Sequence, residues 1–155
     1  MGVQGSGKTT VGRALAERLK WRFADADEFH PAANIAKMSA GIPLDDDDRA
    51  PWLAALRAEI DRTLASNSNL VLTSSALKER YRQQLLTDGV ELVHLRGSQE
   101  LIASRLRERE GHFAKANLLA SQFAQLEEPE NALTIDIAQP VDRILEQILA
   151  GIGLG

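Results

Sequence analysis

Short apolar runs alternate along the chain with longer stretches in which apolar residues return every three or four positions. The runs at residues 23–24, 70–73, 90–95 and 133–137 have the composition of buried strands. The stretches between them have the period of helices that cover one face of a sheet. This alternation predicts the α/β class, with a parallel sheet flanked by helices.

Local signals place the ends of several predicted helices. Pro31 and Gly41 bracket one helix, because proline favours the first helical turn and glycine the position after the last one. The acidic run at 45–48 precedes a long amphipathic pattern and indicates a helix start, where the macrodipole favours negative charge. Ser98 is placed to cap another helix. Further helices are predicted around 11–19, 77–86, 118–126 and 141–149, and the polar residues 109–115 are predicted to form a mobile excursion.

Length and charge narrow the class of partner. The 155 residues are enough for one domain with a real core. The net charge is -4, and the arginines between 105 and 109 are interleaved with glutamates, so the basic patch that nucleic-acid binding needs is absent. A small-molecule partner is therefore favoured over a nucleic acid.

Missing residue types and patterns exclude other kinds of site. The sequence has no cysteine, which excludes disulfides and thiolate metal sites. Its three histidines lie far apart and lack the close spacing of a zinc site. No apolar run approaches the ~20 residues of a transmembrane helix, and no signal pattern is visible. We therefore expect a cytoplasmic protein without membrane contact.

Residues 2–9, GVQGSGKT, match the phosphate-binding motif G-x-x-x-x-G-K-[ST] in full, and a helical pattern follows directly. The glycines let the backbone curl, so that successive N–H groups and a helix N-terminus face one phosphate chain. Lys8 is placed to reach the β- and γ-phosphates of ATP, and the Thr9 hydroxyl to bind Mg²⁺. The predicted nucleotide site consists of Gly2, Val3, Gln4, Gly5, Ser6, Gly7, Lys8 and Thr9.

The strand that should lead into this loop is the missing part of the pattern. The motif is expected to follow a buried strand, whereas only Met1 precedes Gly2. Loss of a central strand removes the hydrogen bonds on both of its sides and a large apolar surface. The prediction is a sheet that lacks its first strand, which a start upstream of Met1 would supply.

Charged residues follow two of the predicted strands. Asp25 and Asp27 come after the run at 23–24, where carboxylates can orient a substrate hydroxyl, accept its proton or contact a metal shell. The pair is equally compatible with a solvated turn or a helix cap. Lys78 and Arg82 follow the run at 70–73 one helical turn apart, so they either face an anionic substrate together or are two surface bases.

Other candidate binding groups are isolated in the sequence. His30 can bind substrate or serve structure, and Arg49 is the cation next to the acidic run. Arg105 and Arg109 share a helical face that leads towards His112. Arginines there suit a lid that closes over phosphates, and exposed helix arginines are also common on ordinary surfaces. The residues alone leave both interpretations open.

Taken together, five blocks resemble the gluconate kinases (gluconokinases) of the P-loop small-molecule kinase group. They are GVQGSGKT at 2–9, DADEFHPAANIAKMSAGIPLDDDDRAPWL at 25–53, SSALKERYR at 74–82, RLREREGHF at 105–113 and LLASQFAQLEEP at 118–129. The P-loop alone is shared by many NTPases, whereas these blocks are far more specific. The resemblance implies the P-loop kinase fold of nucleoside-monophosphate-kinase type, in a single domain over 1–155 with a lid segment around 105–117.

The same resemblance implies an activity, the ATP- and Mg²⁺-dependent phosphorylation of D-gluconate to 6-phospho-D-gluconate (EC 2.7.1.12) in carbohydrate acid metabolism. It implies a homodimer as well. Asp27 would orient or deprotonate the 6-hydroxyl. Four side chains are implied to be catalytic: Lys8, Asp27, Arg105 and Arg109. Six are implied to bind gluconate or to close over it: Asp27, His30, Arg49, Lys78, Arg82 and His112. The chain departs from the family in its absent first strand and in Ser74, where a cysteine is common.

Two alternatives stay open at this point. A shikimate-type or other small-molecule kinase shares the loop and a D-x-D after the second strand, although the blocks at 25–53 and 118–129 favour gluconate. A nucleotide-binding remnant without catalysis is favoured by the absent strand. The presence of Lys8, Thr9, Asp27 and the lid arginines argues against such a remnant.

Overall fold

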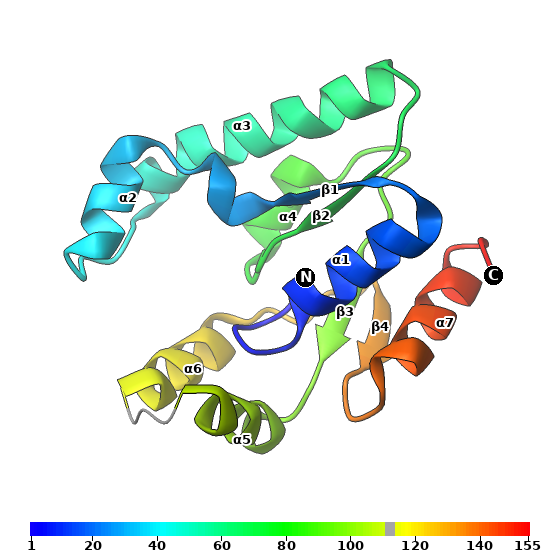
Figure 1. Ribbon diagram of the computed structural model, residues 1–155. Helices are drawn as coiled ribbons and strands as arrows, with labels where there is room; N and C mark the ends of the chain where they lie inside the picture. The colour runs from blue at the N-terminus through cyan, green and yellow to red at the C-terminus, as the bar shows by residue number, and fades with distance from the viewer. Residues whose placement is uncertain (111–113) are drawn as a thin grey trace.

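The computed structural model describes residues 1–110 and 114–155 (Figure 1). Its strands are β1 (Arg22–Asp25), β2 (Leu70–Thr73), β3 (Val93–Arg96) and β4 (Leu133–Asp136), and a 3₁₀ helix η1 (Ala26–Phe29) follows β1. The α-helices are α1 (Lys8–Leu19), α2 (Ala32–Ser39), α3 (Asp46–Ala65), α4 (Glu79–Leu85), α5 (Gln99–Glu110), α6 (Ala114–Gln125) and α7 (Val141–Gly151). Strands and helices alternate as the hydrophobic pattern predicts, and the α/β class is confirmed.

The predicted excursion at 109–115 is wrong at both of its ends. Helix α5 continues to Glu110, and α6 already begins at Ala114. Residues 109–110 and 114–115, at the two ends, contain no proline, so their backbone chemistry does not stop a helix there. Residues 111–113, and with them the predicted lid residue His112, lie outside the described part of the chain.

The strands form two parallel pairs. β1 pairs with β2 so that Asp25 lies opposite Thr73, and β3 pairs with β4 so that Arg96 lies opposite Asp136. Because parallel strands end at the same edge of a sheet, the segments that follow β1 and β2 emerge side by side. This edge is where the sequence predicts the substrate-binding residues.

Among the described residues, the β1–β2 and β3–β4 pairs are separate sheets, and Met1 and Gly2 connect their edges. The Leu95 amide donates to the Met1 carbonyl (2.9 Å), and the Gly2 amide donates to the Ser75 carbonyl (3.4 Å). A cavity of about 570 Å³, lined by β2, β3 and one face of α1, lies between them. The interruption of the sheet falls where the phosphate-loop motif predicts a strand.

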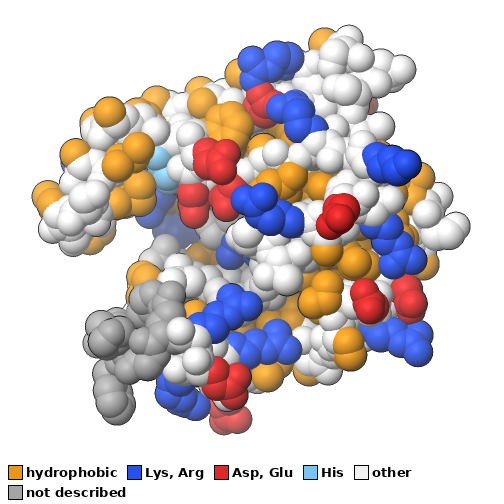
Figure 2. All heavy atoms as spheres, viewed as in Figure 1, with side chains coloured by type: hydrophobic (Ala, Val, Ile, Leu, Met, Phe, Trp, Pro, Cys, Tyr) orange, Lys and Arg blue, Asp and Glu red, His pale blue; other side chains and the backbone are white. Residues whose placement is uncertain are grey.

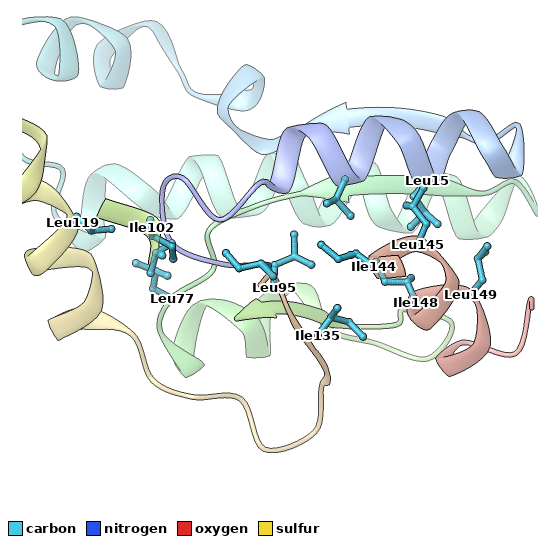
Figure 3. Packing of buried hydrophobic residues seen from close by; sticks show 13 residues of the cluster. Leu15, Leu77, Leu95, Ile102, Leu119, Ile135, Ile144, Leu145, Ile148 and Leu149 are labelled. Atoms are coloured by element: carbon cyan, nitrogen blue, oxygen red, sulfur yellow. The ribbon is translucent and has the colours of Figure 1, made fainter. Parts of the chain in front are cut away.

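Each strand pair has its own hydrophobic core. The larger core surrounds β3 and β4, and Figure 3 shows Leu15 of α1 directed towards Leu145 of α7 within it. The smaller core lies between η1, α3 and α4 and contains Trp52, Leu56 and Tyr81. Burying one such apolar side chain is worth about 1.5–3 kcal/mol. The two cores therefore hold the two sides of the molecule by separate sets of contacts.

Local capping explains where two of the helices begin. The Asp45 carboxylate accepts from the Asp48 amide (2.8 Å), and the Asp48 carboxylate accepts from the Asp45 amide (3.0 Å). This reciprocal box satisfies two amides at the start of α3. The Ser98 hydroxyl likewise accepts from the Leu101 amide at the start of α5 (3.1 Å). Both predicted helix starts are confirmed.

None of the helices within residues 1–110 and 114–155 is both long enough and apolar enough to span a membrane.

Candidate active site

The phosphate loop, residues 2–9, turns tightly before α1. Gly5 and Gly7 have φ values of 80° and 91°, a region that strongly favours glycine. Gly5 also lies against α5, where an added Cβ would come within 2.9 Å of the Leu106 side chain. Glycine is thus required at residue 5 both by the turn and by the packing of α5 beneath it.

Lys8 lies at the end of this loop and faces the acidic side of the neighbouring strand pair. Its ammonium donates to the Val3 carbonyl across the loop (3.0 Å). Burial lowers the pKa of Lys8, and the charges of Asp27 and Asp25 oppose that shift. These three groups therefore lie close enough to interact. Thr9, in the first turn of α1, is exposed.

Helix α6 supplies a contact to the loop that the sequence does not reveal. The side-chain oxygen of Gln122 accepts a hydrogen bond from the Gln4 amide (2.6 Å). This bond ties the loop to the helix that follows the predicted lid segment. A glutamine 118 residues away along the chain carries no local signal that would connect it with the motif.

The two carboxylates after β1 have different tasks. Asp25 accepts from the Asp27 amide (3.0 Å) and so caps η1, which confirms the cap interpretation for this residue. The Asp27 backbone is fixed by that bond, and its carboxylate is exposed. Of the pair, Asp27 is therefore the carboxylate that is available to a bound substrate.

His30 is held beside Asp27 by a tryptophan. Its ring stacks on Trp52, with centroids 4.6 Å apart and planes 11° apart. The Trp52 indole N–H donates to the Ala26 carbonyl (2.7 Å), which fixes α3 to η1. Desolvation lowers the pKa of His30, the charge of Asp27 opposes this, and Arg49 adds to it. His30 therefore presents a neutral ring between an acidic and a basic side chain.

Arg49 and Lys78 reach the same place from different elements. The Arg49 guanidinium donates to the Tyr81 hydroxyl (3.2 Å) and lies over the ring, 5.6 Å from its centroid. Tyr81 in turn donates to the Asp46 carboxylate (2.8 Å). This bond is the largest cause of the lowered pKa of Asp46, and the charges of Arg80, Lys78 and Arg49 contribute as well. Tyr81 is a site residue that the sequence analysis missed.

Four of the predicted substrate-binding residues thus come from neighbouring elements: the charges of Asp27 and Arg49 act on His30, and those of Lys78 and Arg49 act on Asp46. We call Asp27, His30, Arg49 and Lys78 the acceptor cluster. In the view of Figure 2, the surface is hollowed between the part that carries α2 and the part that carries α5. Acidic and basic side chains border this hollow. A polyhydroxylated anion would find cations for its carboxylate and a carboxylate for one of its hydroxyls here.

Arg82 does not belong to this cluster, contrary to the prediction. Its side chain is 1% exposed, and its donors point to backbone carbonyls and to the Glu79 carboxylate. The prediction assumed that Lys78 and Arg82 share a helix face. Lys78 is instead the extended residue before α4, with φ -100° and ψ 141°, so helical spacing does not apply to the pair.

The predicted lid arginines also differ in their surroundings. Arg105 is half-buried and donates to the Ile137 carbonyl just after β4 (2.7 Å). Arg109 is exposed one turn further along α5. Their positions lie on the helix beneath the phosphate loop, as the contact of Gly5 with Leu106 shows. The role of either residue in a lid stays a prediction.

The site has few groups that could hold a metal ion. Within the described part of the chain, no three His, Asp or Glu side chains come together as a metal site. The Thr9 hydroxyl is exposed at the start of α1, which fits Mg²⁺ when nucleotide phosphates provide further ligands. A dedicated protein cage would not be needed.

Comparison with known proteins gives both a family and close relatives. Residues 4–147 match the shikimate kinase family. The chain is 46% identical to a gluconokinase of Gluconobacter oxydans (strain 621H) over 154 residues, which cover 96% of this chain and 86% of that protein. It is 40% identical to the thermoresistant gluconokinase of Escherichia coli (strain K12) over 162 residues, covering 100% of this chain and 92% of that protein.

A solved structure agrees with these relatives. The crystal structure of a gluconokinase from Sinorhizobium meliloti 1021 superposes with a TM-score of 0.85 and 44% sequence identity. The match covers 99% of this chain and 89% of that one. Fold and sequence therefore indicate the same group of kinases.

Proposed function

The chain belongs to the gluconokinase family, within the wider shikimate kinase family, and on this premise we propose that it transfers the γ-phosphoryl group of ATP to the 6-hydroxyl of D-gluconate. The products are ADP and 6-phospho-D-gluconate. One observation carries the proposal: the Gly2 amide of the phosphate loop donates to the Ser75 carbonyl after β2 (3.4 Å), at the same sheet edge from which Asp27 follows β1. Donor and acceptor sites thus lie next to each other.

The phosphate loop binds the triphosphate of ATP. Its backbone N–H groups and the N-terminus of α1 attract phosphate oxygens. The Lys8 ammonium, which bonds to the Val3 carbonyl, turns to the β- and γ-phosphates and stabilises the charge that develops during transfer. Mg²⁺ bound at the Thr9 hydroxyl would neutralise phosphate charge when the nucleotide is present.

The acceptor cluster binds gluconate. Arg49 and Lys78 pair with its carboxylate, and the neutral His30 ring hydrogen-bonds to a hydroxyl. Asp27 accepts the proton of the 6-hydroxyl while that oxygen forms a bond to the γ-phosphorus and the bond from phosphorus to ADP breaks. Arg105 and Arg109 close over the transferred group, and His112, which lies outside the described residues, is proposed for the same lid.

Two properties of the protein stay predictions. A location in the cytoplasm is expected from the sequence pattern, and assembly as a homodimer is implied by the family resemblance. The exposed apolar residues Ile35 and Met38 on α2, at 52% and 44% exposure, form a surface on which a second copy could pack.

A coupled assay of ADP release tests the proposed function. The chain is incubated with ATP and Mg²⁺ and either D-gluconate, shikimate or buffer alone, and Lys8→Met serves as the control for contaminating kinases. We expect release that depends on gluconate and on Lys8. Release with shikimate but not gluconate would assign a shikimate-type kinase, the alternative that the family match keeps open. ATP binding without any acceptor-stimulated release would indicate a non-catalytic remnant.

A further inference from the structure

We propose that Arg82 is a positioning residue: it fixes the loop at residues 74–78, and so the place of Lys78, to the segment that follows α6. The inference rests on the proposed function, because it assigns the reason why Lys78 meets the acceptor. Arg82 itself touches no substrate. Its effect on gluconate is transmitted through the backbone of the loop.

All the hydrogen-bond donors of the Arg82 guanidinium are used within the protein. One terminal nitrogen donates to the carbonyls of Ala76 (2.9 Å) and Leu77 (3.0 Å). The other donates to the Glu127 carbonyl (2.7 Å) and to the Glu79 carboxylate (2.8 Å). Nε donates to the same carboxylate oxygen (3.0 Å). These five bonds to oxygen match the five N–H groups of an arginine, and the Met1 sulfur lies 4.0 Å from the nitrogen that faces Ala76.

The bonds join three segments that are distant or differently folded. Ala76 and Leu77 belong to the loop after β2, Glu79 to the first turn of α4, and Glu127 to the chain after α6. A backbone bond from the Glu127 amide to the Leu77 carbonyl (2.9 Å) closes the same junction. Arg82 therefore stands at the point where the acceptor side and the α6 side of the molecule meet.

The loop needs such support because the backbone conformation of one of its residues is unfavourable. Ala76 has a φ of 45°, in the left-handed region that non-glycine residues rarely adopt. A conformation of this kind persists only when its surroundings determine it. The two Arg82 bonds fall on Ala76 itself and on the next residue, so they hold the strained position directly.

Both ends of the loop at residues 74–78 connect to residues that the proposed reaction uses. At one end, the Ser75 carbonyl accepts from the Gly2 amide of the phosphate loop (3.4 Å). At the other end, Lys78 is the residue from which α4 begins, and its charge acts on Asp46 beside Arg49. Because Lys78 directly follows Leu77, a shift of the loop at Ala76 and Leu77 would move Lys78 relative to the acceptor.

Only arginine has the geometry for this junction. A lysine has three donors on one atom, whereas the guanidinium has five in a planar fork. Arg82→Lys keeps the charge and the pairing with Glu79, yet it leaves carbonyls of Ala76, Leu77 or Glu127 without their donor. The substitution therefore releases the loop without burying an uncompensated carboxylate.

The kinetic test compares Arg82→Lys with the wild-type chain, and Arg143→Lys on α7 is the matched control because Arg143 is exposed and pairs only with Glu146 among the described contacts. We expect Arg82→Lys to raise KM for gluconate by about tenfold or more, with KM for ATP within about twofold. Glu79→Gln should shift KM for gluconate in the same direction by a smaller factor. A fall in kcat with both KM values unchanged would mean a merely structural arginine and would overturn the proposal.

Hydrogen exchange of the same variants tests the junction independently of activity. Arg82→Lys should speed exchange in residues 74–78 and 126–128 while exchange in α7 stays at the wild-type rate. Uniformly faster exchange, or no change at these two segments, would contradict the positioning role. This readout stays decisive even if the wild-type chain shows no turnover with gluconate, an outcome that would instead reject the proposed function.

Discussion

The two strand pairs place the two proposed ligands on different supports. The β3–β4 half contains the larger core, to which Val3 of the phosphate loop contributes. The β1–β2 half contains the smaller core of η1, α3 and α4, and it positions the acceptor cluster. The nucleotide site and the acceptor site are therefore stabilised by separate packing.

The contacts that join these halves come from helix α1 and from two hydrogen-bonded junctions. Helix α1 packs closely on the β1–β2 pair, since a Cβ on Gly12 would come within 2.5 Å of Thr73. The Gly2–Ser75 bond and the Arg82 junction complete the connection. Substitutions within one half should therefore change the kinetics of one substrate, and this separation can be tested residue by residue.

The largest effect is expected in the nucleotide half, from Lys8→Met. Loss of the ammonium removes charge stabilisation of the transferred group, so kcat/KM should fall by about 10³-fold. Steady-state ADP release at saturating gluconate, with the ATP concentration varied, measures this kcat/KM. Urea unfolding of the variant checks that the fold is retained. A decrease of less than tenfold would show that Lys8 is not part of the phosphoryl-transfer site.

The next largest effect is expected where the halves face each other, from Asp27→Asn. Removal of a general base costs at least about 10²-fold; we expect a loss near this lower bound, in kcat, because the amide still forms hydrogen bonds to the acceptor. Glu28→Gln is the matched control, since Glu28 is the exposed neighbour of Asp27. Equal kcat values for wild type and Asp27→Asn would remove Asp27 from the reaction.

A smaller and more selective effect is expected in the acceptor half, from Arg49→Lys. The guanidinium can bind a carboxylate with two parallel bonds, and an ammonium cannot. KM for gluconate should rise by about tenfold while KM for ATP stays unchanged. Arg57→Lys on the same helix is the control, because Arg57 pairs with Asp61 on the exposed face. A matching rise in KM for ATP would contradict the separation of the halves.

The smallest effect is a dependence of stability on pH, from His94 in the nucleotide half. His94 is 1% exposed, and desolvation lowers its pKa below the ordinary value of 6.5, against the opposing charge of Glu128. Above pH 6.5, His94 is unprotonated in both the folded and the unfolded chain, so it does not lower the free energy of unfolding. Below that pH the unfolded chain binds the proton first, so the free energy of unfolding decreases as pH falls towards the lowered pKa.

Urea unfolding between about pH 5 and 8 measures this dependence. One such group contributes a slope of at most about 1.4 kcal/mol per pH unit. His94→Gln should give a shallower acid slope than the wild type. Parallel slopes for the two proteins would show that the proton uptake belongs to other groups.

Much of the fold could be predicted because its elements are short and strongly patterned. The apolar run at 70–73 has the same bounds as β2. The run at 90–95 is predicted as one strand, but β3 begins only at Val93, because pairing with β4 and not composition sets its first residue. The interruption between the strand pairs was also predictable, since the phosphate-loop motif specifies the strand that should fill it.

The candidate site was less predictable where a contact joins distant segments. The sequence predicts Lys78 and Arg82 on one helix, whereas the extended backbone of Lys78 just before α4 separates them. The Trp52 stack that holds His30 and the Gln122 bond to the phosphate loop depend on long-range packing. No local period or spacing encodes such contacts, whereas Tyr81 lies inside the family-like block at 74–82, where its hydroxyl is a signal visible in the sequence.

The identity of the phosphorylated oxygen tests the central claim most directly. Phosphorus NMR without proton decoupling distinguishes the oxygens of gluconate, because a phosphate on the terminal CH₂ group couples to two protons and a phosphate on a CH group of the open chain couples to one. With ATP and D-gluconate, the account predicts that the new ester signal is a triplet and grows in step with ADP. A doublet, or free phosphate without any ester, would contradict transfer to the 6-hydroxyl.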